Sequence, residues 1–330
     1  MTPPTNSPHY QMTNTTTAPF ASLIGQQNIK SKLQFAIETK EAKRPLPHFL
    51  FTASYGFGKT RFIREFAKTI TNGGTTGKYV EINSANIKSV SWFVEKVYMP
   101  YLQDRDNVTV LCDEAHELPK SVQTWLLTVL NTEKSHIRRV VYDDSEIEFD
   151  FLRTSIHFAT TDANKLSKPL KSRMEIMTFA PYSQDDLARI IQINCPDVDF
   201  QDNILQELVF SIKPYPRAAE ILARKVNDFC AIKGRKEFDS ADFVNLSKMA
   251  DIKLHGLDNI EVGILKLLDE RGPMTLTEIS ACLSIPANAL RQDHEHHLLK
   301  KGLLRLDGKR VITAKGSEAA RSFKMVDRAA

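Results

Sequence analysis

Cysteine is scarce in this sequence of 330 residues, and its four cysteines lie far apart. Because no two of them form a C-x-x-C pair, the sequence gives no sign of a zinc knuckle or a dithiol redox site. Free thiols in a reducing compartment are the simplest interpretation, so we expect a cytoplasmic protein.

Long hydrophobic runs are also lacking, and no apolar stretch approaches the length that crosses a membrane. The first 18 residues are rich in Thr, Asn and Pro and lack the apolar core of a signal peptide. We therefore expect a flexible N-terminal arm over residues 1–18. The composition is 42% hydrophobic and 25% charged, which argues against disorder as the main state.

A strong excess of one charge is missing too, since 44 Lys and Arg face 40 Asp and Glu. The small excess gathers at the C-terminal end, where nine basic residues face three acidic ones from Lys300 onward. A basic end suggests a polyanionic partner, although a short charged run is more often solvated surface.

Short apolar runs rich in β-formers alternate with helical patterns between Phe20 and about Ala180. A helix is expected over Thr60–Ile70, with its apolar residues on one face. The lengths of the apolar runs are typical of buried parallel strands, which predicts an α/β domain with a parallel sheet. The expected strands are His48–Thr52, Lys78–Asn83, Val108–Cys112, Ser155–Ala159 and Glu175–Phe179.

Two different patterns follow this domain. From Ser183 to about Met249 we find only helical periodicity, which predicts an all-helical second domain. From about Leu254, three helical segments precede two β-like runs joined by Asp307-Gly308, a hairpin signal. This order predicts a winged helix. Its expected elements are the helices Ile260–Leu268, Thr275–Leu283 and Asn288–Lys300 and the strands Leu303–Leu306 and Lys309–Ile312.

A phosphate-binding loop is predicted after the first strand, where residues 53–60 read ASYGFGKT. The segment matches the Walker A pattern except that Ala53 replaces the first glycine. Gly56 and Gly58 allow backbone N–H groups to close around phosphate oxygens at a helix N-terminus. Lys59 would reach the β- and γ-phosphates of ATP, and the Thr60 hydroxyl would hold Mg²⁺.

An acidic pair completes this chemistry, because the apolar run Val108–Cys112 leads into Asp113 and Glu114. Asp113 would orient Mg²⁺, and Glu114 would polarise the attacking water as general base. Asp-Glu-Ala-His also spells a helicase box, but those helicases need a second RecA-like domain, which this chain does not offer after Phe179. We expect His116 to make a local polar contact rather than to act as a ligand.

Three further side chains are candidates for sensing the γ-phosphate. Thr160 follows a predicted strand and could reach the phosphate or the attacking water, with Thr161 as its neighbour. Arg173 lies before the last strand, where it could enter a neighbouring subunit's site as an arginine finger. Arg217 opens a lid helix and could act as a second sensor. Each has a purely structural alternative. Thr160 could be an ordinary threonine at a strand end, Arg173 could form a surface ion pair, and Arg217 could be a surface arginine.

Together these motifs resemble the RuvB family of AAA+ ATPases from about Phe20 to Gly316. The resemblance supports Arg173 as the finger and places Tyr182 beside the adenine. It also implies nucleotide contacts by five further residues. The segments that carry it are Gly56–Thr60, Asp113–His116, Ala159–Thr161, Pro169–Arg173 and Pro216-Arg217. The five further nucleotide contacts are Leu23, Ile24, Tyr55, Phe57 and Arg61.

The resemblance implies an AAA+ P-loop core at residues 19–181, a small helical lid at 182–252 and a DNA-binding winged helix at 253–330. It also implies a homo-oligomeric, hexameric ring that uses ATP and Mg²⁺ to drive branch migration of Holliday junctions in recombination and repair. The partner would be double-stranded or four-way DNA. Arg305, Lys309 and Arg310 lie around the wing and suit phosphate contacts.

A replication initiator of the Orc/Cdc6 kind or a helicase loader, in which ATP acts as an assembly switch, is the alternative. A nucleotide-regulated DNA-binding regulator is a third class. The predicted hairpin at 137–151 favours the RuvB-type motors, because initiators typically lack it. The family's hairpin is apolar and docks the RuvA adaptor. Here it is charged, which leaves open whether a RuvA-like adaptor is the partner. The charged residues are Arg138, Arg139, Asp143, Asp144, Glu146 and Glu148.

Overall fold

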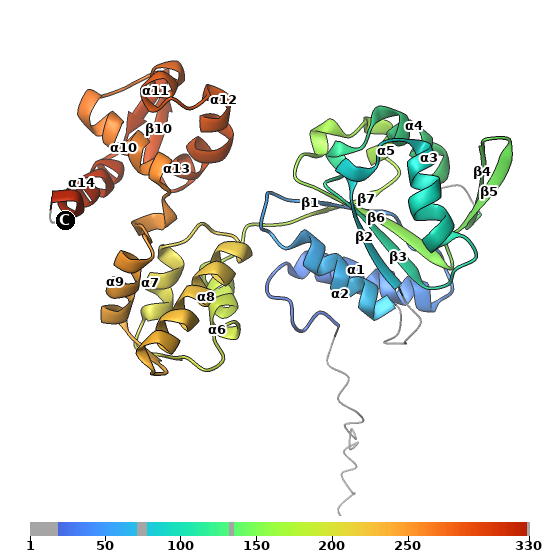
Figure 1. The fold of residues 1–330 in the computed structure, drawn as a ribbon, viewed down its shortest axis with the longest axis horizontal. Helices are drawn as coiled ribbons and strands as arrows, with labels where there is room; N and C mark the ends of the chain where they lie inside the picture. The colour runs from blue at the N-terminus through green and yellow to red at the C-terminus, as the bar shows by residue number, and fades with distance from the viewer. Residues whose placement is uncertain (1–18, 71–77, 132–134, 329–330) are drawn as a thin grey trace, which may run out of the picture. The chain divides into compact units, whose positions relative to one another are not determined.

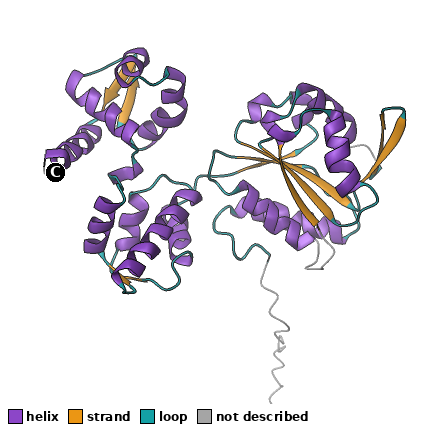
Figure 2. Cartoon of the chain, in the orientation of Figure 1, coloured by secondary structure: helices purple, strands orange, loops and turns teal. Residues whose placement is uncertain are grey.

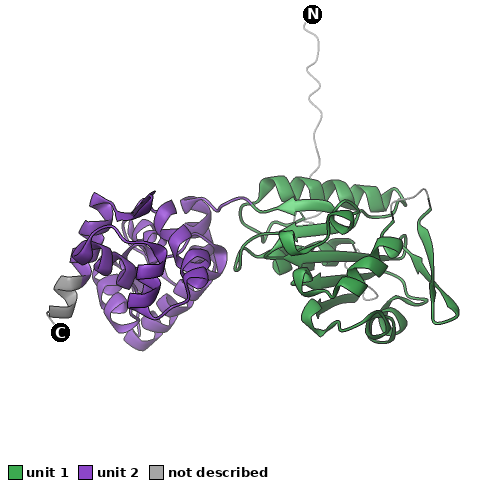
Figure 3. Cartoon of the chain, turned by 90° about the horizontal axis from the view of Figure 1, so that it is seen from above, with its two compact units in different colours: residues 1–179 green, residues 180–330 purple. Residues whose placement is uncertain are grey.

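The computed structural model describes residues 19–70, 78–131 and 135–328, so the predicted N-terminal arm lies outside the described residues. The chain forms two compact units, residues 1–179 and 180–330 (Figure 3). The finer division into three domains, at 19–181, 182–252 and 253–330, stays a prediction. Among the described residues, none of the helices combines the length and the apolar character needed to span a membrane.

The first unit is built on a five-stranded sheet in the order β2-β3-β6-β1-β7. Every neighbouring pair in this sheet is parallel, which confirms the predicted α/β class. The central strands β3 and β6 are almost completely buried because helices cover both faces of the sheet. The strands are β1 (Phe49–Thr52), β2 (Lys78–Asn83), β3 (Val108–Asp113), β6 (Thr154–Thr160) and β7 (Glu175–Thr178).

Helices α1 (Gln27–Glu41) and α2 (Lys59–Ile70) cover one face of the sheet (Figure 1). The predicted apolar stripe of α2 is buried there against β1 and β7, as expected. The other face carries shorter helical segments that form a separate core. These are α3 (Val90–Phe93), η2 (Val94–Leu102), η3 (Ala115–Glu117), α4 (Lys120–Val129) and α5 (Lys168–Lys171), with the short turns η1 (Ser84–Asn86) and η4 (Ala163–Lys165).

The predicted hairpin is present as the antiparallel strands β4 (Ile137–Tyr142) and β5 (Ser145–Asp150), which form a sheet of their own. Its turn holds Asp143 and Asp144 with φ of 46° and 60°, the left-handed conformation that a tight two-residue hairpin requires. The hydroxyl of Tyr98 donates to the backbone carbonyl of Glu148 and anchors the hairpin to η2.

The second unit begins with four helices, α6 (Gln184–Ile193), α7 (Ile204–Phe210), α8 (Pro216–Lys233) and α9 (Ser240–Met249). Capping boxes start α6 at Ser183 and α9 at Asp239. The predicted all-helical character needs one correction. Strands β8 (Asp199–Phe200) and β9 (Glu237–Phe238) form a two-residue parallel pair, which is too short to leave a periodic pattern in the sequence.

The winged helix follows a 3-10 turn, η5 (Leu254–Gly256), and contains the predicted three helices and wing (Figure 2). The third helix is continuous from Ala287 to Lys300. A C-terminal helix, α14 (Ala314–Arg328), was not predicted. It packs on α10 through the buried Ala319 and Ala320. The other elements are α10 (Asn259–Arg271), α11 (Leu276–Leu283), α12 (Ala287–Ala289), η6 (Leu290–Glu295), α13 (His296–Lys300), β10 (Leu304–Asp307) and β11 (Lys309–Ile312).

Candidate nucleotide site and DNA-contacting surface

The phosphate loop joins the end of β1 to the start of α2. Gly56 and Gly58 have φ of 81° and 89°, a conformation that glycine adopts without strain. Ala53, the one departure from the Walker A pattern, does not need such a φ. Its N–H donates to the carbonyl of Thr160 at 3.3 Å. The alanine therefore occupies this position without backbone strain.

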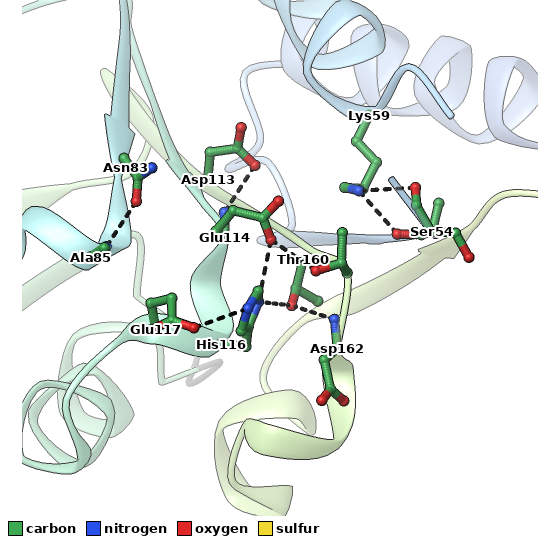
Figure 4. A network of polar contacts seen from close by, with 12 residues as sticks. Ser54, Lys59, Asn83, Ala85, Asp113, Glu114, His116, Glu117, Thr160 and Asp162 are labelled. Carbon is green, nitrogen blue, oxygen red and sulfur yellow. Dashed lines mark hydrogen bonds and ion pairs between the residues drawn. The ribbon is translucent and has the colours of Figure 1, made fainter. Parts of the chain in front are cut away.

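The Lys59 side chain is held inside this loop. Its ammonium donates to the carbonyl oxygens of Ala53 at 2.9 Å and Ser54 at 3.3 Å (Figure 4). Burial lowers the pKa of Lys59, and the negative charges of Glu114 and Asp113 oppose that shift. Neutral carbonyls are weaker partners for an ammonium than phosphate oxygens are, so an entering phosphate would replace them.

Thr60 and Asp113 bring two oxygen ligands together at the end of β3. The Thr60 hydroxyl donates to Asp113 Oδ2 at 3.2 Å. Burial raises the pKa of Asp113, partly offset by the N–H of Glu114, which donates to Oδ1 at 2.9 Å. A hydroxyl beside a partly buried carboxylate is the kind of hard oxygen donor set that suits Mg²⁺.

Glu114 has a left-handed backbone, with φ 49° and ψ 49°. This conformation costs a non-glycine residue free energy and is found where a side chain must be aimed. The Thr161 hydroxyl donates to Glu114 Oε2 at 3.0 Å, and His116 Nδ1 lies 3.3 Å from the same oxygen.

The structure gives Thr160 and Thr161 different surroundings, and the role of either as the sensing hydroxyl stays a prediction. Thr160 is fully buried, and its Oγ1 lies 3.0 Å from His116 Nδ1 and accepts from the N–H of Asp162. Thr160 is the last residue of β6 and reaches Glu114 only through His116, whereas the Thr161 hydroxyl, just past the end of the strand, contacts Glu114 directly. Thr161 is therefore the hydroxyl beside the predicted general base.

His116 makes the local polar contact that the sequence predicted. Its Nδ1 lies between Thr160 and Glu114, and its Nε2 lies 3.2 Å from Glu117 Oε1 (Figure 4). The ring is thus the link between the buried threonine and the carboxylate, which motif spacing alone did not reveal.

Arg173 follows α5 and is half-buried. Its Nη1 donates to the carbonyl of Pro169 at 2.9 Å, and its Nε is buried without a hydrogen-bond partner among the described residues. Arg217, in the first turn of α8, and the buried Tyr182 belong to the second unit. Their predicted nucleotide contacts therefore stay predictions, as does the role of Arg173 in a neighbouring subunit.

The remaining predicted nucleotide contacts have different surroundings. Leu23 is buried in the core beneath α1 and α2, so only its backbone is available to a nucleotide. Phe57 packs against the same core, whereas Tyr55 is 64% exposed. Ile24 is half-buried and Arg61 lies exposed in the first turn of α2.

The wing holds the predicted DNA-contacting cations in unequal environments. Arg305 and Lys309 are exposed. Arg310 differs from them, because its guanidinium forms hydrogen bonds of 3.0 to 3.3 Å with both carboxylate oxygens of Glu295, and both side chains are largely buried. Its charge is already paired inside the winged helix, so the DNA contact predicted for Arg310 is less favoured than those of Arg305 and Lys309 and stays a prediction.

Comparison with known families agrees with this architecture. A model described as the Holliday junction DNA helicase RuvB P-loop domain matches residues 17–179. A second, described as the RuvB C-terminal winged helix domain, matches residues 254–320. Together the two models span well over half of the chain.

Similar proteins include the Holliday junction branch migration complex subunit RuvB of Thermotoga maritima, 26% identical over 302 residues, which cover 88% of this chain and 87% of the relative. The RuvB subunit of Rickettsia africae is 28% identical over 309 residues, covering 88% and 85%. A solved structure of the Thermotoga maritima RuvB branch migration motor superposes with a TM-score of 0.72 at 24% identity, covering 90% of this chain and 95% of that one, which shows the shared fold.

Proposed function

We propose, from the premise that this chain belongs to the RuvB family of AAA+ P-loop ATPases, that it is an ATP-driven motor for branch migration of Holliday junctions. One observation carries this proposal. The chain combines a phosphate loop and the acidic pair Asp113 and Glu114 with a winged helix that has a basic wing. Both parts match models of one family. Such a motor would act in recombination and repair, in the cytoplasm.

In this proposal the P-loop and the acidic pair share the chemistry of hydrolysis. Lys59 would bind the β- and γ-phosphates, and Thr60 with Asp113 would hold Mg²⁺. Glu114 would accept a proton from the attacking water, with Thr161 and His116 fixing its carboxylate. When bound, ATP and Mg²⁺ supply the phosphoanhydride bond and the neutralising charge.

Assembly would complete the site. Arg173 of a neighbouring copy would stabilise charge on the γ-phosphate as an arginine finger in a hexameric ring. Arg217 would act as the second sensor, and Tyr182 would lie beside the adenine. Arg305 and Lys309 would grip DNA phosphates without reading sequence, which suits a protein that moves along DNA.

An adaptor protein would dock on the hairpin β4–β5. Val141 at its surface is 75% exposed and lies opposite Glu146, and the exposed Asp143 and Asp144 form the turn beyond this pair. Because these exposed side chains are acidic, we propose that the adaptor carries a basic surface, whether or not it resembles RuvA.

Steady-state ATP turnover with and without four-way DNA tests the function. We expect turnover to rise when DNA is added. We also expect Glu114→Gln to lower it by about 10² to 10⁴-fold while ATP binding, measured by calorimetry, persists. Negligible turnover of the unaltered protein together with stable ATP-dependent DNA binding would instead support an initiator-like switch.

A further inference from the structure

Within the second unit, a cluster of five polar side chains joins the loop before α8 to the winged helix. Lys213, from that loop, directs its ammonium to Asp258 Oδ2 at 3.0 Å and Glu261 Oε1 at 3.1 Å. His294 Nδ1 lies 3.1 Å from the same Asp258 oxygen, and His297 Nδ1 lies 2.9 Å from the same Glu261 oxygen. We call these five residues the Lys213 cluster.

The geometry of the cluster follows from the start of α10. Asp258 and Glu261 form a capping box, in which Asp258 Oδ1 accepts from the N–H of Glu261 and Glu261 Oε2 accepts from the N–H of Asp258, both at 2.9 Å. The cap uses one oxygen of each carboxylate and leaves the other for Lys213 and a histidine. The helix cap therefore fixes the direction in which the lysine is held.

The cluster is an ion-pair network rather than a metal site. Ligand atoms of Asp258, Glu261 and His294 lie within 4.8 Å of one another, which alone would suit a cation. The Lys213 ammonium, however, already contacts both carboxylates. Burial opposes its charge, but hydrogen bonding to Asp258 and the charge of Glu261 outweigh burial and raise the pKa of Lys213. Glu261 is fully buried, so losing the ammonium would leave its charge with only the His297 ring and the Asp258 N–H as partners.

Close backbone packing beside Lys213 is a second observation that supports a rigid connection between the loop before α8 and the winged helix. Gly256 packs so closely on the preceding loop that a Cβ there would lie 2.4 Å from the carbonyl carbon of Ile212 and 2.6 Å from the backbone nitrogen of Lys213. Pro214 and Pro216 restrict the segment that leads from Lys213 to Arg217. A displacement of Arg217 thus reaches Lys213 through a short, stiff stretch of chain.

We propose that Lys213 is a positioning residue that couples helix α8 to the winged helix, so that a movement at Arg217 is passed to the DNA-contacting wing. The third helix of the winged helix takes part directly, because His294 and His297 hold the same carboxylate oxygens as the lysine. This inference rests on the proposed function. It adds the link by which the state of the nucleotide changes the position of the wing.

Lys213→Met in the full chain tests the coupling, because it keeps the aliphatic stem and removes the charge. We expect its DNA-free turnover, its KM for ATP and its DNA affinity to match the unaltered protein, while stimulation of turnover by four-way DNA falls by about tenfold. Lys213→Arg should restore most of the stimulation. Lys225→Met is the matched control, since the Lys225 ammonium of α8 donates to a backbone carbonyl, that of Ala250.

Glu261→Gln removes one of the two ion pairs of Lys213 with little change in shape, so we expect it to lower the stimulation as well, and it provides the test if Lys213→Met does not fold. Equal stimulation in Lys213→Met, Lys225→Met and the unaltered protein would overturn the coupling. Loss of stimulation in Lys213→Arg as severe as in Lys213→Met would also overturn it, because the geometry requires only a cation at this place. If DNA does not stimulate the unaltered protein, the proposed function itself fails and this inference fails with it.

Discussion

Lys309 and Arg310 are neighbouring cations of the wing. We expect removal of Arg310 to lower stability, and removal of Lys309 to weaken DNA binding instead. Arg310→Ala leaves the largely buried carboxylate of Glu295 unpaired, so we expect it to destabilise the protein by about 3 kcal/mol. Lys309→Ala should leave stability unchanged and reduce the salt dependence of DNA binding by about one unit of slope. Urea unfolding and DNA-binding titrations at several salt concentrations measure the two effects. If Arg310→Ala left stability unchanged and weakened DNA binding, Arg310 would instead be a residue that contacts DNA.

Residue spacing predicted which motifs form the nucleotide site, but it did not predict the individual side-chain contacts. The Walker patterns identified Lys59, Thr60, Asp113 and Glu114 because strand, loop and helix must follow in that order around a phosphate. The choice between Thr160 and its neighbour depended on where the strand ends, and sequence patterns place strand ends only to within a few residues. Likewise, the partner of Arg310 lies 15 residues away along the chain and has no local signature.

Two buried histidines make the stability of the central sheet depend on pH. Burial lowers the pKa of His48 to about 4 and that of His157 to about 3. His48 Nδ1 lies 3.2 Å from the carbonyl of Ile156, and His157 Nδ1 accepts from the N–H of Phe49. The two rings thus join β1 to β6 while neutral.

The sign of the effect follows from these lowered pKa values. Below pH 6.5 both histidines become protonated in the unfolded chain, whereas in the folded sheet they stay neutral until the pH approaches their lowered pKa values. Stability is therefore intact above pH 6.5 and falls as the pH drops toward about 4, by about 1.4 kcal/mol per pH unit for each histidine. Urea unfolding between pH 7 and pH 4.5 measures the slope. We expect His48→Gln to reduce this slope by about 1.4 kcal/mol per pH unit, the contribution of one proton. An unchanged slope in His48→Gln would contradict the assignment.

At the scale of elements, periodic patterns predicted the five strands, the lid helices and the winged helix, because each buries an apolar stripe with a clear repeat. Helix α14 escaped prediction because its segment is mostly small or charged, and it packs through Ala319 and Ala320 rather than large side chains. The pair β8–β9 escaped because two residues cannot show a period. In both cases tertiary contacts specify the element and local sequence does not.

At the scale of the whole molecule, the proposed finger makes hydrolysis a property of the assembly. Arg173→Ala alone should lower turnover by about 10³-fold or more and leave ATP binding intact. Glu114→Gln alone should be nearly inactive for a different reason, the loss of the base. When the two variants are mixed, a Glu114→Gln copy can lend its intact finger to an Arg173→Ala copy that retains its base. With equal amounts mixed at random, about a quarter of the sites would hold both groups.

Turnover of the mixture should therefore rise well above that of either variant, and it should increase with protein concentration as copies associate. The control is a mixture of Arg173→Ala with Lys59→Ala/Arg173→Ala, which offers no finger from any copy and should stay inactive. If Arg173 instead stabilised charge within its own subunit, no mixture could combine a finger with a base. The mixed sample would then be as inactive as its parts, and hydrolysis would not depend on a neighbouring copy through this residue.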